Sequence, residues 1–182
     1  RIMHKIYLKK YYFIDKFEFD NIKNLDCNTS IIFRNYNSDI NFNELLRFRN
    51  ICKRNNIKFY LSNNLKLAVK LKCDGCYIPS FNKRTFVKGM LLKKKFDILG
   101  SAHNIKEIRH KELQGVNTLF ISSLFKRNKN YLGINKFKII KNYTKKKVVA
   151  LGGISIKNIK LLKLLGLSSF AGITYFKKKP LQ

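Results

Sequence analysis

Val148–Ser155 reads Val-Val-Ala-Leu-Gly-Gly-Ile-Ser, an apolar run that leads into two glycines and a serine. The apolar residues predict a buried strand, and the serine predicts the start of a helix. Glycines let a backbone approach an anion closely, and a helix N-terminus offers unpaired N–H groups. Gly152 and Gly153 therefore predict a phosphate-binding turn. A plain tight turn between a strand and a helix is the alternative.

Outward from this stretch, the same pattern recurs in both directions. Short runs rich in Ile, Val, Phe and Tyr alternate with stretches of helical spacing, which leave room for one helix between neighbouring runs. The runs predict eight strands: Tyr11–Ile14, Ser30–Phe33, Lys58–Leu61, Gly75–Ile78, Asp97–Leu99, Thr118–Ile121, Val148–Leu151 and Phe170–Ile173.

Eight strand–helix units predict an α/β fold with a parallel sheet. Closed on itself, the sheet is a single compact (β/α)8 TIM barrel over residues 1–182, with its site at the C-terminal ends of the strands. An open doubly wound sheet with fewer strands is the alternative. At 182 residues the barrel is short, so its helices must be short. In the barrel, 148–151 is the seventh strand, and phosphate sites commonly follow the seventh and eighth strands.

Helical spacing predicts helices over 41–54, 65–71, 80–95, 105–113 and 156–165. Asn43, Asn104 and Ser155 are the expected N-caps, because short polar side chains satisfy the free N–H groups of a first turn. Gly115 and Gly166 then end their helices. The last residues, 177–182, read as a frayed basic tail.

The chain carries 39 Lys and Arg against 10 Asp and Glu, a formal net charge of +29. Such a charge suggests an anionic partner. A compositional bias toward Lys, Asn and Ile is the alternative. Basic runs at 93–95, 145–147 and 177–179 are scattered, which favours solvated helix ends and loops over a nucleic-acid surface.

No segment approaches the roughly 18–20 apolar residues of a membrane span. Residues 1–10 show no apolar h-region, which favours a cytoplasmic protein with reduced thiols. Cys73 and Cys76 form a C-x-x-C pattern that opens a strand, with neither a paired His nor a second pair. Packing or turn roles are expected for it, ahead of zinc or redox chemistry.

Residues 100–104, Gly-Ser-Ala-His-Asn, follow the predicted fifth strand. Small residues leave room for a ligand, Ser101 supplies a hydroxyl, and His103 can move a proton near neutral pH. We therefore expect Ser101 and His103 to be catalytic, with a structural histidine as the alternative. His110 lies in a basic helix and reads as a solvated surface residue.

Five short motifs occur in one order along the chain: Ser-Asn-Asn-Leu-Lys-Leu-Ala at 62–68, Cys-Asp-Gly-Cys-Tyr-Ile at 73–78, Ser-Ala-His-Asn at 101–104, Leu-Gly at 132–133 and Val-Ala-Leu-Gly-Gly-Ile at 149–154. With this order and spacing, residues 62–176 resemble the thiamine-phosphate synthase/TenI family. Two earlier matches are looser, Phe-Ile-Asp-Lys at 13–16 and Phe-Arg-Asn-Tyr at 33–36.

The resemblance implies a (β/α)8 barrel that joins a pyrimidine pyrophosphate to a thiazole phosphate and releases pyrophosphate. In this family two carboxylates hold Mg²⁺, and Asn63 and Asn82 stand at their places here. The metal site is therefore weakened, since an amide oxygen ligates Mg²⁺ without supplying charge. Ile32 replaces the family's pyrimidine-reading Gln, and Tyr36 replaces a Lys. The motif of the sixth-strand loop is replaced by residues 127–130, Arg-Asn-Lys-Asn.

The family's phosphate end is retained in Gly153, Ile173 and Thr174, together with Arg34. The resemblance thus implies substrate binding by these residues with Asn63 and Lys129, and phosphorylated heterocycles as ligands. Direct neutralisation of pyrophosphate by Lys129, Arg127 and Arg84 would replace the lost metal ligands. Two alternatives stay open: a metal-independent TenI-like tautomerase with His103 as acid and base, and a non-catalytic barrel with a decayed site that binds a phosphate ligand or nucleic acid.

Overall fold

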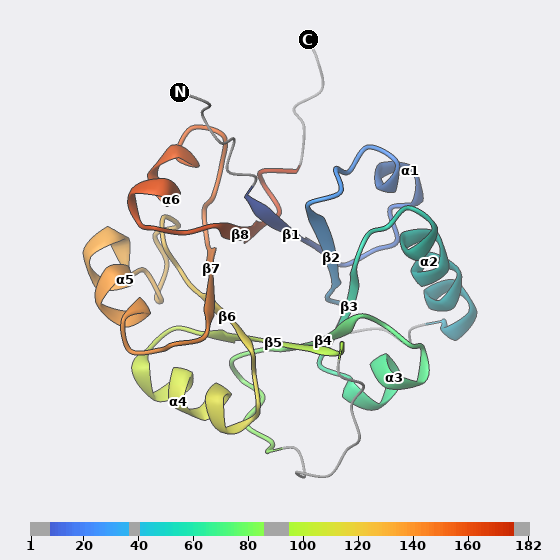
Figure 1. Ribbon diagram of the computed structural model, residues 1–182, viewed down its shortest axis with the longest axis horizontal. Coiled ribbons are helices and arrows are strands. Elements are labelled where there is room, and N and C mark those ends of the chain that lie inside the picture. Colours follow the sequence, from blue (N-terminus) through green and yellow to red (C-terminus); the bar gives the residue numbers. More distant parts are fainter. Residues whose placement is uncertain (1–7, 37–40, 86–94, 177–182) are drawn as a thin grey trace.

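The computed structural model describes residues 8–36, 41–85 and 95–176. Within these residues, eight parallel strands close into a barrel in sequence order, with β1 paired to β8 (Figure 1). They are β1 (Lys9–Ile14), β2 (Thr29–Phe33), β3 (Phe59–Ser62), β4 (Gly75–Ile78), β5 (Asp97–Ala102), β6 (Thr118–Ile121), β7 (Lys147–Leu151) and β8 (Ser169–Gly172). All eight apolar runs form strands, and the (β/α)8 barrel is confirmed over the open sheet. The domain boundary at 1–182 stays a prediction.

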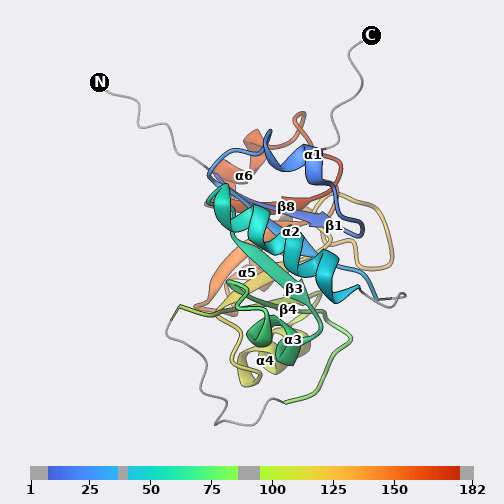
Figure 2. The same ribbon diagram turned by 90° about the vertical axis from the view of Figure 1, so that its right-hand side faces the viewer.

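Short helices surround the ring of strands (Figure 1). In the described parts of the chain they are α1 (Phe19–Ile22), α2 (Phe42–Arg54), α3 (Leu65–Lys70), α4 (Ile105–Leu113), α5 (Gly133–Lys141) and α6 (Lys160–Leu164). A side view shows α2 and α3 on the flank formed by β3 and β4 (Figure 2).

Aromatic side chains fill the inside of the barrel. Tyr11 and Phe120 meet edge to face with ring centroids 4.9 Å apart, and Phe13 meets Tyr77 in the same way at 5.2 Å. The remaining inward positions are buried as well: Ile32, Tyr60, Leu99, Val149 and Ala171. The interior is therefore a packed core, so a ligand binds at an end of the barrel and not through it.

Local capping differs from expectation at two of three helices. Asn104 caps α4 as predicted and accepts a hydrogen bond from the Glu107 N–H. The α2 cap is Asn41 instead of Asn43, which lies inside the helix. The expected cap at Ser155 is wrong, because the helix begins only at Lys160 and residues 156–159 form a turn.

The reason for the late start of α6 is a local side-chain bond. Asn158 Oδ1 accepts from the Ser155 N–H at 2.9 Å, and its Nδ2 donates to the Gly153 carbonyl at 2.8 Å. An Asn side chain that binds nearby backbone in this way competes with helix formation.

Two other differences concern whole helices. The sequence pattern did not reveal α1 or α5, and α5 begins at Gly133 without a side-chain cap. A helix was expected over 80–95, but residues 80–85 are not helical. Residues 86–94 lie outside the described residues, as does the expected tail at 177–182.

Candidate active site

A cavity of about 260 Å³ opens at the C-terminal end of the barrel. Residues that follow different strands line it, among them Arg34 after β2, His103 after β5, Lys126 after β6, Gly153 after β7 and Thr174 after β8. None of its lining residues within the described chain is Asp or Glu. The two cations therefore meet no opposing charge there, and the cavity is suited to an anion.

The glycine pair joins the turn after β7 to the loop after β6. Gly152 and Gly153 have φ of +102° and +76°. A Cβ on Gly152 would lie 2.3 Å from Ser123 Oγ, and one on Gly153 would lie 2.6 Å from the Lys126 nitrogen. The Gly152 carbonyl accepts the N–H groups of Phe125 and Lys126. Close packing against this loop is thus a structural reason for the glycines beside the expected anion approach.

The turns after β7 and β8 meet at the cavity. Gly153, Ile173 and Thr174 all line it. No hydrogen-bond partner occurs in the described part of the chain for the backbone N–H groups of Gly153 and Thr174. Two free donors beside one cavity can bind phosphate oxygens. The structure brings these predicted residues together, and the anion itself stays a prediction.

His103 lies at the cavity wall and is oriented by Glu107. One carboxylate oxygen, Oε2, binds the His103 backbone N–H at 2.8 Å and its Nδ1 at 2.9 Å. When Nδ1–H donates to the carboxylate, Nε2 is left as a proton acceptor. The sequence reasoning missed Glu107. Its signal was the capping box, in which Glu stands three residues after the cap Asn104.

Ser101 lies below the cavity, inside the barrel. Only 5% of it is exposed, and it is not among the lining residues. Its hydroxyl lies near the buried Tyr77 side chain, and burial raises the pKa of Tyr77 above its usual value. The structure therefore gives Ser101 a contact in the core, while His103 occupies the cavity wall.

Asn63 and Asn82, which follow β3 and β4, form a direct pair. Asn82 Nδ2 donates to Asn63 Oδ1 at 2.7 Å, and the backbone N–H of Arg84 donates to Asn82 Oδ1 at 2.9 Å. Both amide oxygens already accept a hydrogen bond, and neither residue supplies a negative charge. Mg²⁺ is usually held by carboxylates together with substrate phosphates. The pair does not fit a resident Mg²⁺ site.

The rest of the described chain offers no cluster of metal ligands either. Across residues 8–36, 41–85 and 95–176, no three His, Cys, Asp or Glu residues cluster closely enough to hold a metal ion.

The cations lie on two sides of the cavity. The Arg34 guanidinium lies 5.0 Å from the centroid of the Phe13 ring, and both residues line the cavity. In the loop after β6, the lining residues are Lys126, Asn128 and Asn130. Lys129 is exposed in the same loop but is not part of the lining. The sequence placed the basic stretch at 126–130 on the rim of the site, with Lys129 as the expected binding residue, and Lys126 is the cation of this stretch that lines the cavity.

The predicted packing role of the C-x-x-C pattern agrees with the structure. Cys52, Cys73 and Cys76 are buried free thiols, and burial raises the pKa of each to about 12. Thiols in this state are poor nucleophiles and poor metal ligands. Cys27 is free and exposed.

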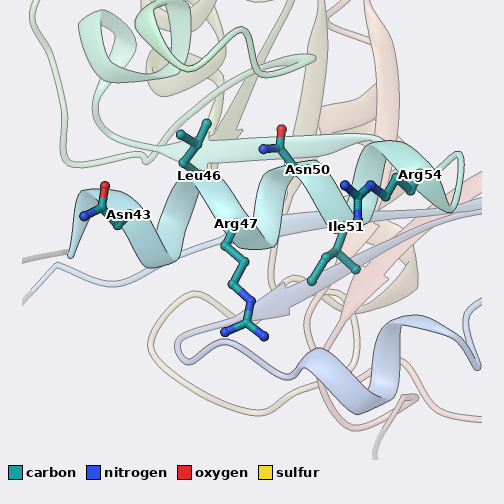
Figure 3. A pocket seen from close by; sticks show the side chains of 6 residues that line it. All are labelled: Asn43, Leu46, Arg47, Asn50, Ile51 and Arg54. Atoms are coloured by element: carbon teal, nitrogen blue, oxygen red, sulfur yellow. The ribbon is translucent and has the colours of Figure 1, made fainter.

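Three larger hollows lie away from the strand ends. The smallest of them, of about 410 Å³, lies between α4 and residues 142–146. Another, of about 420 Å³, lies along α2, where Arg47 and Ile51 point to the opposite side of the helix from Asn50 (Figure 3). The largest, of about 680 Å³, lies beside β1 and α1. Its charged groups are already engaged, because Lys10 pairs with Asp26 and Glu18 binds the Tyr12 hydroxyl. The cavity beside His103 is the candidate active site because it lies at the C-terminal ends of the strands, although other hollows are larger.

Comparisons by sequence agree on one family. The family model described as thiamine monophosphate synthase matches residues 26–176. The thiamine-phosphate synthase of Pelagibacter ubique is 30% identical over 158 residues, which cover 79% of this chain and 75% of that protein. The thiamine-phosphate synthase of Fusobacterium nucleatum is 28% identical over 137 residues, 73% of this chain. The match spans 66% of the Fusobacterium protein, slightly less than two thirds.

A solved structure shows the same fold. The thiamine phosphate pyrophosphorylase from Pyrococcus furiosus superposes with a TM-score of 0.75 at 21% identity, covering 91% of this chain and 85% of that one. Among the helices of the described residues, none has the length and apolar character to cross a membrane.

Proposed function

Because this chain belongs to the thiamine monophosphate synthase family, we propose that it joins hydroxymethylpyrimidine pyrophosphate to thiazole phosphate in the cytoplasm. The observation that carries the proposal is the cavity at the strand ends, which Arg34 and Lys126 line together with Gly153 and Thr174, whose backbone N–H groups have no partner in the described chain. A site with this charge is suited to phosphorylated heterocycles. The free thiols are consistent with a reducing compartment.

The chemistry explains why the cations matter. A C–N bond forms to the thiazole nitrogen while the C–O bond to pyrophosphate breaks, and the electron pair of that bond leaves with pyrophosphate. Negative charge therefore builds up on the leaving group. Fixed cations aimed at that charge lower the barrier. Arg34 and Lys126 line the cavity, and Lys129 extends the positive charge along the loop.

The thiazole phosphate binds at the turns after β7 and β8 in this proposal. The N–H groups of Gly153 and Thr174 hold its oxygens, and the Ile173 side chain covers the ring. Since Asn63 and Asn82 do not fit Mg²⁺, no step here depends on the metal contacts expected at these two residues.

A metal-independent tautomerase is the second candidate. It is favoured by the pairing of His103 with Glu107, which leaves Nε2 facing the cavity as a proton acceptor. Ser101, the other expected catalytic residue, would act only through the core contact with Tyr77, as a positioning residue.

The deciding experiment mixes the purified protein with both thiamine precursors, with and without Mg²⁺, and measures thiamine phosphate. Formation of thiamine phosphate that falls about tenfold or more in Arg34→Ala supports the synthase, because a cation at a developing charge is worth this much. Turnover of a thiazole substrate alone, lost in His103→Gln, supports the tautomerase instead. Salt-sensitive DNA binding with no turnover refutes both and favours the non-catalytic alternative.

A further inference from the structure

The Asn63–Asn82 pair has only one orientation that satisfies its neighbours. The backbone N–H of Arg84 can only donate, so Asn82 must accept with Oδ1. Asn82 then presents Nδ2 to Asn63, and Asn63 must accept with its own Oδ1. Within the described part of the chain, Asn63 Nδ2 is left without a partner. The pair therefore exposes N–H donors at a place where two carboxylates would expose oxygens.

Helix α4 fixes the backbone that carries Asn82. Lys111 Nζ donates to the carbonyls of Pro79 and Asn82 and to Gln114 Oε1, at 2.7–2.8 Å. Gln114 Nε2 donates to the Asn82 and Arg84 carbonyls. Lys111 is 1% exposed, and its ammonium group donates all three of these hydrogen bonds inside the protein. These bonds hold the backbone around Asn82, so its side chain extends from a fixed position after β4.

Aromatic contacts hold the pair from its other side. The Tyr36 hydroxyl hydrogen bonds Ser62 Oγ at 2.9 Å, and the Tyr36 ring meets Phe81 edge to face at 5.5 Å. Ser62 and Phe81 directly precede Asn63 and Asn82 in the chain. The turns after β2, β3 and β4 are therefore tied together around the pair.

Charge at the pair also favours an anion. Asn63 and Asn82 are neutral, and Arg84 contacts Asn82 through its backbone N–H, so neither Asn places a negative charge there that would repel an anion. The amide groups project N–H bonds whose partial positive charge repels a divalent cation and attracts a phosphate oxygen.

We propose that the Asn63–Asn82 pair is a metal-independent hydrogen-bond donor site for phosphate oxygens of a pyrophosphate group. This proposal deepens the proposed function, since it assigns the pyrophosphate end of the substrate to neutral N–H donors and fixed cations. Pyrophosphate carries several oxygens that accept hydrogen bonds, so one phosphoryl group can accept from Asn63 Nδ2 at the ends of β3 and β4.

The test is calorimetric titration of the intact protein with inorganic pyrophosphate at fixed ionic strength, in EDTA and in Mg²⁺. Wild type is expected to bind in EDTA, and Mg²⁺ is expected not to tighten the binding. Asn82→Asp and Asn63→Asp are nearly isosteric and place a like charge beside the ligand. Each is expected to weaken binding in EDTA by about tenfold or more and to regain it in Mg²⁺.

A matched variant controls for the change in net charge. Asn50→Asp makes the same substitution at an exposed residue of α2, which is not among the residues that line the cavity (Figure 3). It is expected to bind like wild type, and urea unfolding of each variant checks that the barrel is intact. Wild-type binding that requires Mg²⁺, no wild-type binding in either condition, or Asp variants that bind as tightly as wild type in EDTA would each overturn the proposal.

The outcome is separable from that of the proposed function. Pyrophosphate binding with the expected Asp response, but without thiamine phosphate formation, rejects the synthase and leaves the donor site intact. If the protein forms thiamine phosphate but the wild type binds pyrophosphate only in Mg²⁺, the synthase is supported and the donor site is rejected.

Discussion

Glu107 binds His103 twice through a single oxygen, at the backbone N–H and at Nδ1. Its other oxygen accepts from Asn104 Nδ2, and its own N–H donates to Asn104 Oδ1. The start of α4 and the orientation of the imidazole therefore depend on the same carboxylate. Glu107 thus takes part in the cap of α4 and also orients the His103 ring at the cavity wall.

Replacing Glu107 by Ala is expected to lower the free energy of unfolding by about 1 kcal/mol, because the first turn of α4 loses its capping box. Turnover should fall as well, since Nδ1 loses its acceptor. Glu107→Gln retains an acceptor at the same place and is the matched control. Urea unfolding and steady-state rates measure the two effects, and equal stability of the Ala and Gln variants would contradict the capping role.

Gly115 and Gly153 have similar backbone angles but different surroundings. Comparing their Ala variants therefore separates the cost of backbone strain from the cost of close packing. Gly115 has φ of +78° and nothing within 4 Å of its Cβ position, whereas Gly153 has φ of +76° and faces the Lys126 nitrogen at 2.6 Å. Gly115→Ala is expected to cost about 1 kcal/mol for its backbone angle alone. Gly153→Ala adds displacement of the loop after β6, for a total of about 2–4 kcal/mol.

The affinity for inorganic phosphate should also differ between the two variants. Gly153→Ala is expected to lose affinity for inorganic phosphate, since it moves a donor and the loop that carries Lys126. Gly115→Ala should bind as wild type does. Equal unfolding free energies for the two variants, measured in urea, would refute the packing argument.

The buried Lys111 makes stability depend on alkaline pH. Burial lowers the pKa of Lys111 from 10.5 to about 8, so between pH 8 and 10.5 the unfolded chain holds a proton that the native state has released. By linkage, the contribution of Lys111 to the free energy of unfolding rises over this range, by about 2–3 kcal/mol in total.

Comparison with Lys111→Met isolates this contribution from other groups that titrate in the same range. The free energy of unfolding of wild type minus that of the variant is expected to increase between pH 7.5 and 10.5. Urea titrations at both pH values provide it. A difference that does not change with pH would show that Lys111 keeps an ordinary pKa in the native state.

The four cysteines should differ in how fast their thiols react with a reagent in solution. Cys27 is exposed, while Cys52, Cys73 and Cys76 are buried with pKa values of about 12. A coloured aromatic disulfide reagent at pH 8 is expected to modify one thiol rapidly in the native protein and all four after unfolding. Cys27→Ser should remove the rapid phase. More than one rapidly reacting thiol would mean that the flank around β3 and β4 opens readily.

The elements that the sequence predicted correctly are those whose signals are local. The apolar runs at all eight strands, the Asn104 cap and the glycine turn after the seventh strand depend on residues near in the chain. Failures were local as well. The Asn158 side chain outcompeted the expected cap at Ser155, and α5 begins without a capping side chain to mark it.

The sequence by itself determined the alternation of strands and helices, and thereby the barrel and the end at which its site lies, because backbone periodicity is written in neighbouring residues. Only the tertiary structure decided which side chains meet there. Barrel closure and strand register bring Asn82 onto Asn63 and put Lys111 beneath that loop, and they turn Ser101 toward Tyr77 in the core. Such contacts depend on the positions of separate strands around one axis, a relation that no local pattern records.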